Sequence, residues 1–138
     1  MIKKAIVIGA TSGIGRGISQ VLVKQNYLVG ITGRRSNLLE ALKSENPSQY
    51  ITSTFDISET KSINQKLEEL TKQLGGLDLL IVSAGTGKIL EKLEFENEKN
   101  TIDVYVLGFT AICDWAYNYF ESQKYGHLVG ISSIAGLR

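Results

Sequence analysis

Short runs of aliphatic and β-branched residues alternate along this chain with longer segments of helical period, and this alternation restricts the possible folds more than any other feature. The short runs predict five buried strands, at residues 4–9, 28–33, 50–55, 77–83 and 127–132. The longer segments predict helices at residues 13–26, 36–46, 58–74 and roughly 98–123. Strands that alternate with helices form a parallel sheet covered by helices on both faces. We therefore expect residues 1–138 to form a single α/β domain with a doubly wound sheet.

Periodicity also predicts which face of each helix is buried. In the first helix, the inward positions are expected to be Ile14, Ile18, Val21 and Leu22. In the third helix they are expected to be Ile63, Leu67, Leu70 and Leu74, and Gly75 with Gly76 should end this helix. Ligands of such sheets bind beyond the carboxyl ends of the strands, so we expect the functional residues directly after each strand.

A glycine-rich loop, residues 9–15, joins the first strand directly to the first helix. Glycine permits positive φ angles and lets the backbone approach a pyrophosphate closely, while the helix N-terminus adds unpaired N–H donors. We interpret the loop as part of a dinucleotide site of a Rossmann-type sheet with strand order 3-2-1-4-5; the alternative is a plain structural turn. The expected contacts are Gly9, Thr11, Ser12, Gly13, Ile14 and Gly15.

The loop resembles the T/G-x-x-x-G-x-G motif of the short-chain dehydrogenase/reductase (SDR) family. Five further landmarks follow in the family's order: Gly33-Arg34-Arg35, Asp56-Ile57, Ser83-Ala84-Gly85, the segment 101–108, and Ile131-Ser132-Ser133. The resemblance covers all 138 residues. It implies an oxidoreductase that transfers hydride between a nicotinamide cofactor and a small carbonyl or alcohol substrate.

The end of the second strand bears on the choice of cofactor. An acidic residue there would bind the ribose 2′-OH of NAD(H) and repel a 2′-phosphate, but this chain has Gly33 followed by Arg34 and Arg35. Because a guanidinium suits a phosphate, we expect NADP(H) to be preferred over NAD(H), with Arg34 the stronger candidate and Ser12 as a further contact. The alternative is a pair of solvated loop arginines.

The resemblance assigns the other cofactor contacts to the ends of the third and fourth strands. Asp56 corresponds to the family's adenine-binding aspartate and Ile57 follows it, although Asp56 with Glu59 also fits a helix capping box. Ser83, Ala84 and Gly85 stand where the family usually has Asn-Ala-Gly. The small residues Ala84 and Gly85 should let the cofactor ribose pass.

The family's catalytic groups are matched only in part. Ser133 corresponds to the serine that hydrogen-bonds the reacting oxygen, whereas Tyr105 occupies the position of the family's asparagine. The family's Tyr-x-x-x-Lys motif, about a dozen residues beyond the serine, is not present in the 138 residues. Three readings therefore remain: the cofactor-binding part of an NADP(H)-dependent reductase, a non-catalytic dinucleotide-binding module, or an inactive truncated remnant.

Composition narrows the remaining possibilities. A net charge of +1 gives no reason to expect nucleic acid or an anionic membrane as a partner. The single cysteine, Cys113, fits a reducing cytoplasm, and no segment reads as a membrane span. The segment 101–120 is apolar nearly all round, and the apolar strand residues 128–131 would be exposed if the sheet ended there. We therefore expect this chain to self-associate, as a homo-oligomer or by aggregation.

Overall fold

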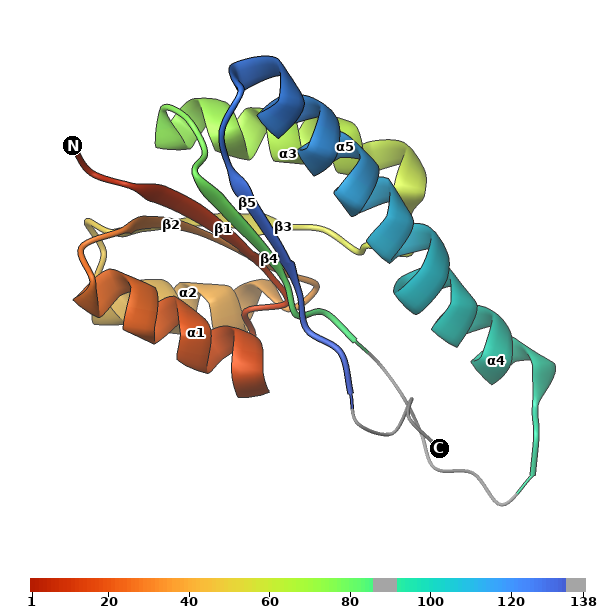
Figure 1. The fold of residues 1–138 in the computed structure, drawn as a ribbon. Coiled ribbons are helices and arrows are strands. Elements are labelled where there is room, and N and C mark those ends of the chain that lie inside the picture. Colours follow the sequence, from red (N-terminus) through yellow and green to blue (C-terminus); the bar gives the residue numbers. More distant parts are fainter. Residues whose placement is uncertain (86–91, 134–138) are drawn as a thin grey trace.

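The computed structural model describes residues 1–85 and 92–133, and its elements follow the alternation expected from the sequence (Figure 1). The strands are Lys4–Ile8 (β1), Leu28–Gly33 (β2), Tyr50–Thr54 (β3), Leu79–Val82 (β4) and His127–Gly130 (β5). The helices are Gly13–Lys24 (α1), Ser36–Glu45 (α2), Thr60–Leu74 (α3), Phe95–Ile102 (α4) and Phe109–Gln123 (α5). A π-helical segment, Asp103–Gly108 (η1), joins α4 to α5.

The described residues form one five-stranded parallel sheet in the order β3-β2-β1-β4-β5, which confirms the predicted topology. Strand β1 lies at its centre, where Ile6 pairs with Gly30 of β2 and with Leu80 of β4. The chain adds β2 and β3 on one side of β1 and then returns to add β4 and β5 on the other side, so the strand order reverses between β1 and β4. Ligands of open α/β sheets bind outside the carboxyl ends of the strands at such a reversal.

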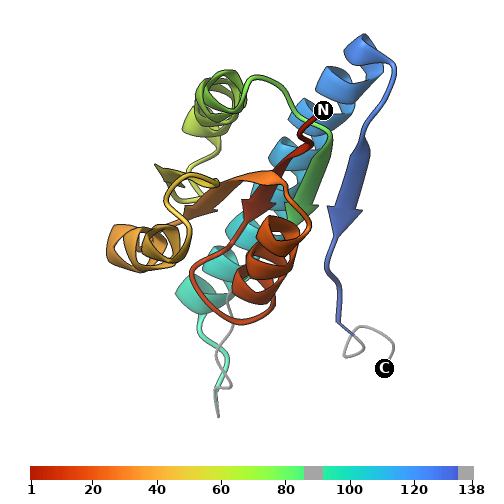
Figure 2. The same cartoon turned by 90° about the vertical axis from the view of Figure 1, so that its left-hand side faces the viewer.

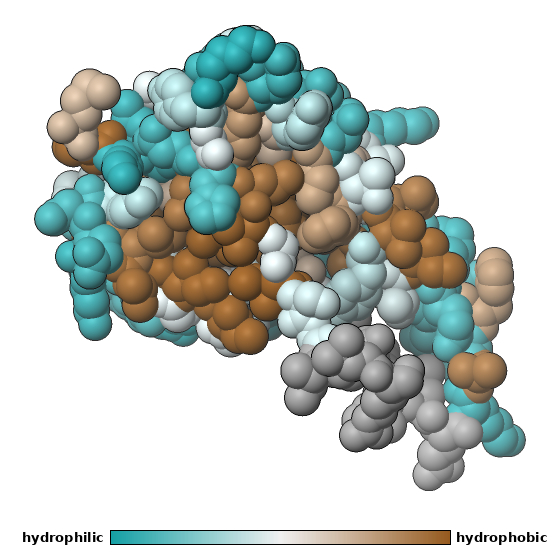
Figure 3. Space-filling view, viewed as in Figure 1, coloured by the Kyte–Doolittle hydropathy of each residue, from teal (hydrophilic) through white to brown (hydrophobic). Residues whose placement is uncertain are grey.

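Helices lie on both faces of the sheet (Figures 1 and 2). Helices α3 and α5 enclose one hydrophobic core with the sheet, and α1 and α2 enclose the other. On the second face α1 packs mainly on β1 and β2, and α2 packs on β2 and β3. Figure 3 shows that hydrophobic residues gather on the surface over β5 and α1. None of the helices in the described part of the chain is both long and apolar enough to cross a bilayer.

The predicted buried face of α1 was half right. Leu22 is buried and Ile18 packs against the core, but Ile14 and Val21 are 62% and 57% exposed, and Gly15, Ser19 and Val23 are buried in addition. The reason is a close approach at its first turn, where a Cβ on Gly15 would collide with the carbonyl oxygen of Gly9. The small residues therefore face inward, and the Ser19 hydroxyl donates a 2.8 Å hydrogen bond to the carbonyl of Gly15.

The buried face of α3 matches the prediction, because Ile63, Leu67, Leu70 and Leu74 all lie in the core. Gly75 ends this helix in the left-handed conformation, as expected. The long helix predicted at 98–123 begins three residues earlier, at Phe95, and its regular winding is interrupted by η1. In η1 a Cβ on Gly108 would lie 2.5 Å from the Ile57 carbonyl oxygen, so the π-helical segment packs tightly against the loop after β3.

Candidate functional site

Two adjoining cavities lie at the carboxyl ends of the strands in the described part of the chain. The first has a volume of about 130 Å³ and extends from the glycine loop to the loop after β3. The second has a volume of about 500 Å³ and lies between η1 and the end of β5. Both are lined by Ser83, Ala84 and Gly85, so the two cavities adjoin at the segment after β4.

Most of the residues expected to bind a dinucleotide meet in the first cavity. They are Gly9, Thr11, Ser12, Arg34, Arg35, Asp56, Ile57, Ser83, Ala84 and Gly85. Five further residues line the cavity: Gly33, which the sequence had indicated only as a position without an acidic group, and Ile8, Thr32, Phe55 and Val104, which sequence reasoning missed. Four of the five lie at or next to the ends of strands, and this position could have indicated them as site residues. Val104 lies in η1, and nothing in the sequence pattern indicated that it would line the cavity.

The glycine loop is held against both neighbouring strand ends. The amides of Gly9 and Ala10 donate to the Thr32 carbonyl at 3.2 and 2.9 Å. Gly9 has a φ of +84°, and a Cβ there would stand 2.6 Å from the Ala84 backbone nitrogen. Only glycine fits this turn, because both the backbone angle and the contact exclude a side chain.

Gly13, Ile14 and Gly15 form the first turn of α1 and do not line the first cavity. Amides in the first turn of a helix have no partner within it, and they carry the positive end of the helix dipole. The side chain of Ser12, the N-cap residue, makes no capping hydrogen bond, and the first turn holds no acidic residue. These amides are therefore suited to an anion.

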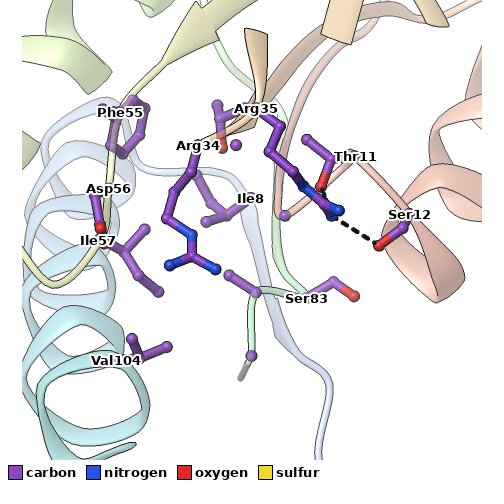
Figure 4. A pocket seen from close by; sticks show the side chains of 15 residues that line it. Ile8, Thr11, Ser12, Arg34, Arg35, Phe55, Asp56, Ile57, Ser83 and Val104 are labelled. Carbon is purple, nitrogen blue, oxygen red and sulfur yellow. Dashed lines mark hydrogen bonds between the residues drawn. The ribbon is translucent and has the colours of Figure 1, made fainter. Parts of the chain in front are cut away.

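The arginines after β2 point in different directions (Figure 4). Arg35 turns toward the glycine loop, where its Nη2 donates to Thr11 Oγ1 at 2.8 Å and to Ser12 Oγ at 3.3 Å. Arg34 extends instead into the cavity, between Ile57 and Ser83. A guanidinium and two hydroxyl groups thus converge at one rim, an arrangement that matches the oxygen atoms of a phosphate.

Asp56 lines the first cavity but does not cap α3, so the expected capping box was wrong. Its Oδ1 accepts hydrogen bonds from the Ser58 backbone N–H at 2.9 Å and from the Ser58 hydroxyl at 2.7 Å. Helix α3 begins at Thr60, and its N-cap Glu59 makes no side-chain capping bond. The local turn after β3 therefore fixes Asp56 at the cavity, between Phe55 and Ile57.

Ser133 and Tyr105 meet at the second cavity. Ser133 is exposed just beyond β5, with Ser132 and Ile131 beside it, and Tyr105 approaches from η1. The position of Tyr105 is set by η1, since π-helical turns reorient the side chains that they carry and often occur at functional sites. Residues 134–138 lie outside the described part of the chain.

Comparison with known proteins decides the family. A family model described as short chain dehydrogenase matches residues 3–138, which is nearly the whole chain. This chain belongs to the short-chain dehydrogenase family. Membership confirms the resemblance seen in the sequence.

Individual family members agree with this assignment. An uncharacterized oxidoreductase of Myxococcus xanthus is 33% identical over 141 residues, an alignment that covers 99% of this chain and 56% of that protein. A short-chain dehydrogenase from Streptomyces avermitilis superimposes with a TM-score of 0.92 at 24% identity, covering 100% of this chain and 52% of that one. ElxO, solved with NADP bound, gives a TM-score of 0.88 at 24% identity, covering 100% and 58%. The chain therefore spans about half the length of these relatives.

The described residues fit a dinucleotide of the kind that short-chain dehydrogenases use. A Cβ at Gly9 or Gly15 would collide with the protein's own backbone, whereas a Cβ at Gly13 would meet nothing within 4 Å. The loop is therefore tightly packed on the protein side and open at Gly13, in the helix turn whose N–H groups suit a pyrophosphate. The first and second cavities share the small residues Ser83, Ala84 and Gly85 in their walls. Arg35 lines the first cavity and Ser133 lines the second, so each cavity has a polar group.

Proposed function

We propose that this protein binds NADP(H) in preference to NAD(H) and serves hydride transfer between the nicotinamide and a small carbonyl or alcohol substrate. The observation that carries the proposal is the position of Arg35, which is hydrogen-bonded to Thr11 and Ser12 at the rim of the first cavity. The end of β2 holds Gly33 rather than an acidic residue that would repel a 2′-phosphate. The NADP bound to ElxO, a neighbour of the same fold, supports it.

Each end of the site has a role in this proposal. The first turn of α1 binds the pyrophosphate through its N–H groups, and Arg35 with Ser12 and Thr11 binds the 2′-phosphate. Phe55, Asp56 and Ile57 enclose the adenine. When bound, the cofactor supplies or accepts the hydride. The Ser133 hydroxyl donates a hydrogen bond to the substrate oxygen, which stabilises the negative charge that develops there.

The geometry changes which arginine is the better candidate for binding the 2′-phosphate. The sequence favoured Arg34 for the 2′-phosphate, but Arg35 is the one that lies against the glycine loop. We therefore assign the phosphate to Arg35. Arg34, which lies over the cavity near Ile57, suits a position against the face of the adenine, where a guanidinium can stack.

Calorimetric titration of the 138-residue chain with NADPH and with NADH tests the proposal. We expect Arg35→Ala to weaken NADPH binding about tenfold or more, since it removes a charge-assisted hydrogen bond, and to leave NADH binding nearly unchanged. Arg34→Ala should weaken both cofactors to a similar extent. Lys124→Ala is the matched control, because Lys124 pairs with Glu121 at the end of α5 and its loss changes the net charge equally.

Three results would contradict the proposal. The chain could bind neither cofactor, it could bind NADH as tightly as NADPH, or Arg35→Ala could weaken NADPH no more than Lys124→Ala does. The last result would mean that NADPH affinity depends only on the net charge of the chain. Arg35 would then be a solvated loop residue without a specific contact to the cofactor.

A non-catalytic dinucleotide-binding module is the second candidate. It is favoured by Tyr105, which fills the place of the family's asparagine and lies beside the cavity that holds Ser133. Oxidation of NADPH in the presence of a panel of ketones and aldehydes separates the candidates. Tight cofactor binding without turnover would support the module.

A further inference from the structure

Tyr105 lies directly over the backbone of Gly85. A Cβ on Gly85 would stand 2.5 Å from the Tyr105 hydroxyl oxygen and 2.9 Å from the ring carbon that carries it. The phenol therefore occupies the space that a side chain at position 85 would need. About half of Tyr105 remains exposed, 48% by relative area, so the ring is in contact with the protein on one side and open on the other.

Phe109 makes the equivalent contact one helical turn later. A Cβ on Gly130, at the end of β5, would lie 3.1 Å from two carbon atoms of the Phe109 ring. Gly85 follows β4 and Gly130 ends β5, and these strands are neighbours in the sheet. Two aromatic rings from the η1–α5 junction thus rest on the bare backbone of two adjacent strand ends.

The rings and the strand ends enclose the second cavity, whose walls differ in chemistry. Tyr105 and Phe109 form an aromatic wall, and Ile131 extends it. The hydroxyl-bearing residues Ser83, Ser132 and Ser133 line the same cavity. A molecule that suits this lining combines a polar oxygen with a flat apolar group whose ring faces are accessible.

We propose that Tyr105 is a specificity-determining residue that contacts the substrate, and that the second cavity takes aryl or conjugated carbonyl compounds. The proposal rests on the proposed function in that it places the substrate oxygen at the Ser133 hydroxyl. The ring of Tyr105 packs against the flat group of the substrate. A ring pair gains from offset stacking or edge-to-face contact, whereas a saturated ring of equal size gains only from burial.

Ligand binding measured by NMR tests this without any need for turnover. Acetophenone and cyclohexyl methyl ketone have the same skeleton and differ in the flatness of the ring, so they are the two probes. In the 138-residue chain saturated with NADPH, we expect Tyr105→Leu to weaken acetophenone about fivefold and to change the saturated ketone less than about twofold. Tyr105→Phe should keep acetophenone binding, because the ring carries the contact.

Tyr117→Leu is the matched control, because Tyr117 is an exposed tyrosine of α5 that lines neither of the two cavities. It should leave both ketones unchanged. Gly85→Ala supplies an independent variant, since its methyl group must displace the Tyr105 ring. It should weaken acetophenone in the native background at an NADPH concentration that saturates the variant.

Equal losses for both ketones in Tyr105→Leu, or no loss for either, would overturn the proposal. Loss of acetophenone binding in Tyr105→Phe would also overturn the assignment to the ring. NADPH affinity, measured separately for every variant, keeps the two proposals distinct: failure to bind NADPH counts against the proposed function, whereas intact NADPH binding without ring selectivity counts against Tyr105 alone. Circular dichroism of each variant confirms that it is folded.

Discussion

Gly33 and Thr11 touch where the second strand meets the glycine loop, and this contact connects one backbone position to the candidate phosphate site. A Cβ on Gly33 would collide with the methyl carbon of Thr11, whose hydroxyl accepts a hydrogen bond from Arg35. Glycine at position 33 therefore has two effects: it leaves out an acidic group, and it leaves space for the side chain of Thr11. It gives Thr11 the room to orient its hydroxyl toward Arg35.

Gly33→Ala should accordingly disturb Thr11 and release Arg35. We expect NADPH affinity to fall about tenfold, the cost of one charge-assisted hydrogen bond, with a smaller effect on NADH. Thr11→Ser keeps the hydroxyl and removes the colliding methyl group, so the double variant Gly33→Ala/Thr11→Ser should regain most of the affinity. Titration calorimetry of the three variants checks this, and a double variant as weak as Gly33→Ala would refute the contact as the cause.

Tyr50 is a second residue whose environment has a measurable consequence. It is 1% exposed, and its hydroxyl has no hydrogen-bond partner among the described residues. Burial, with a smaller contribution from the negative charge of Glu45, raises the pKa of Tyr50 from 10.0 to about 12. Between these values the unfolded chain loses the proton while the folded chain keeps it, so the stability present below pH 10 is lost as the pH rises toward 12.

The free energy of unfolding should therefore fall between pH 10 and pH 12, and it should fall less steeply in Tyr50→Phe. At pH 8, where neither form ionises, Tyr50→Phe should be as stable as the native chain or slightly more so, because it removes a buried hydroxyl without a partner. Urea titrations at a series of pH values measure both effects. Tyr117→Phe, at an exposed site, is the control, and equal slopes for the two variants would argue against a buried Tyr50.

At the scale of single elements, the helices show where periodicity is a sound guide. In α3 a continuous apolar stripe packs flat on the sheet, and the predicted face was confirmed residue by residue. In α1 the close packing of Gly15 on the glycine loop turns small residues inward and leaves Ile14 exposed. Hydrophobic periodicity cannot reveal such a face, because it scores the side chains and not the distance between backbones.

The end of α3 offers a test of local backbone conformation. Gly75 has a φ of +79°, and a Cβ there would meet only Lys4, with its Nζ 3.7 Å away. Space is therefore available, and any cost of substitution comes from the left-handed backbone itself. We expect Gly75→Ala to lower the free energy of unfolding by about 1 kcal/mol and Gly75→Asn to lower it less, as measured by urea denaturation. Equal costs for both variants would point to the lost packing of Lys4 instead.

At the scale of the whole molecule, the sequence predicted which residues line the site better than it predicted the directions of their side chains. Residues after each strand were expected to meet, and they do, because the carboxyl ends of parallel strands share one edge of the sheet. The different directions of the Arg34 and Arg35 side chains could not be predicted, because the folded backbone of the loop decides where neighbouring residues point. The contribution of Val104 and the contact of Tyr105 with Gly85 depend in the same way on the π-helical turn.

The surface carries apolar areas at β5 and in the segment 101–120, as expected, and a further one over α1 that was not expected. Strand β5 is an edge of the described sheet, and Figure 3 shows hydrophobic residues gathered over β5 and α1. Val129 of β5 is only partly buried, and Val21 of α1 is exposed. An exposed strand edge beside an apolar patch favours pairing between copies of a chain. The 138-residue chain should therefore associate at micromolar concentration.

Val21→Lys should shift this association toward the monomer, because a charge in the patch must be desolvated when two copies meet. Gln25→Lys adds the same charge to an exposed position just after α1 and should have a smaller effect. Sedimentation velocity distinguishes the species, with the monomer at 15.1 kDa. A native chain that sediments as a monomer at every concentration would refute the prediction. Equal shifts in the two variants would show that net charge, and not the patch, controls association.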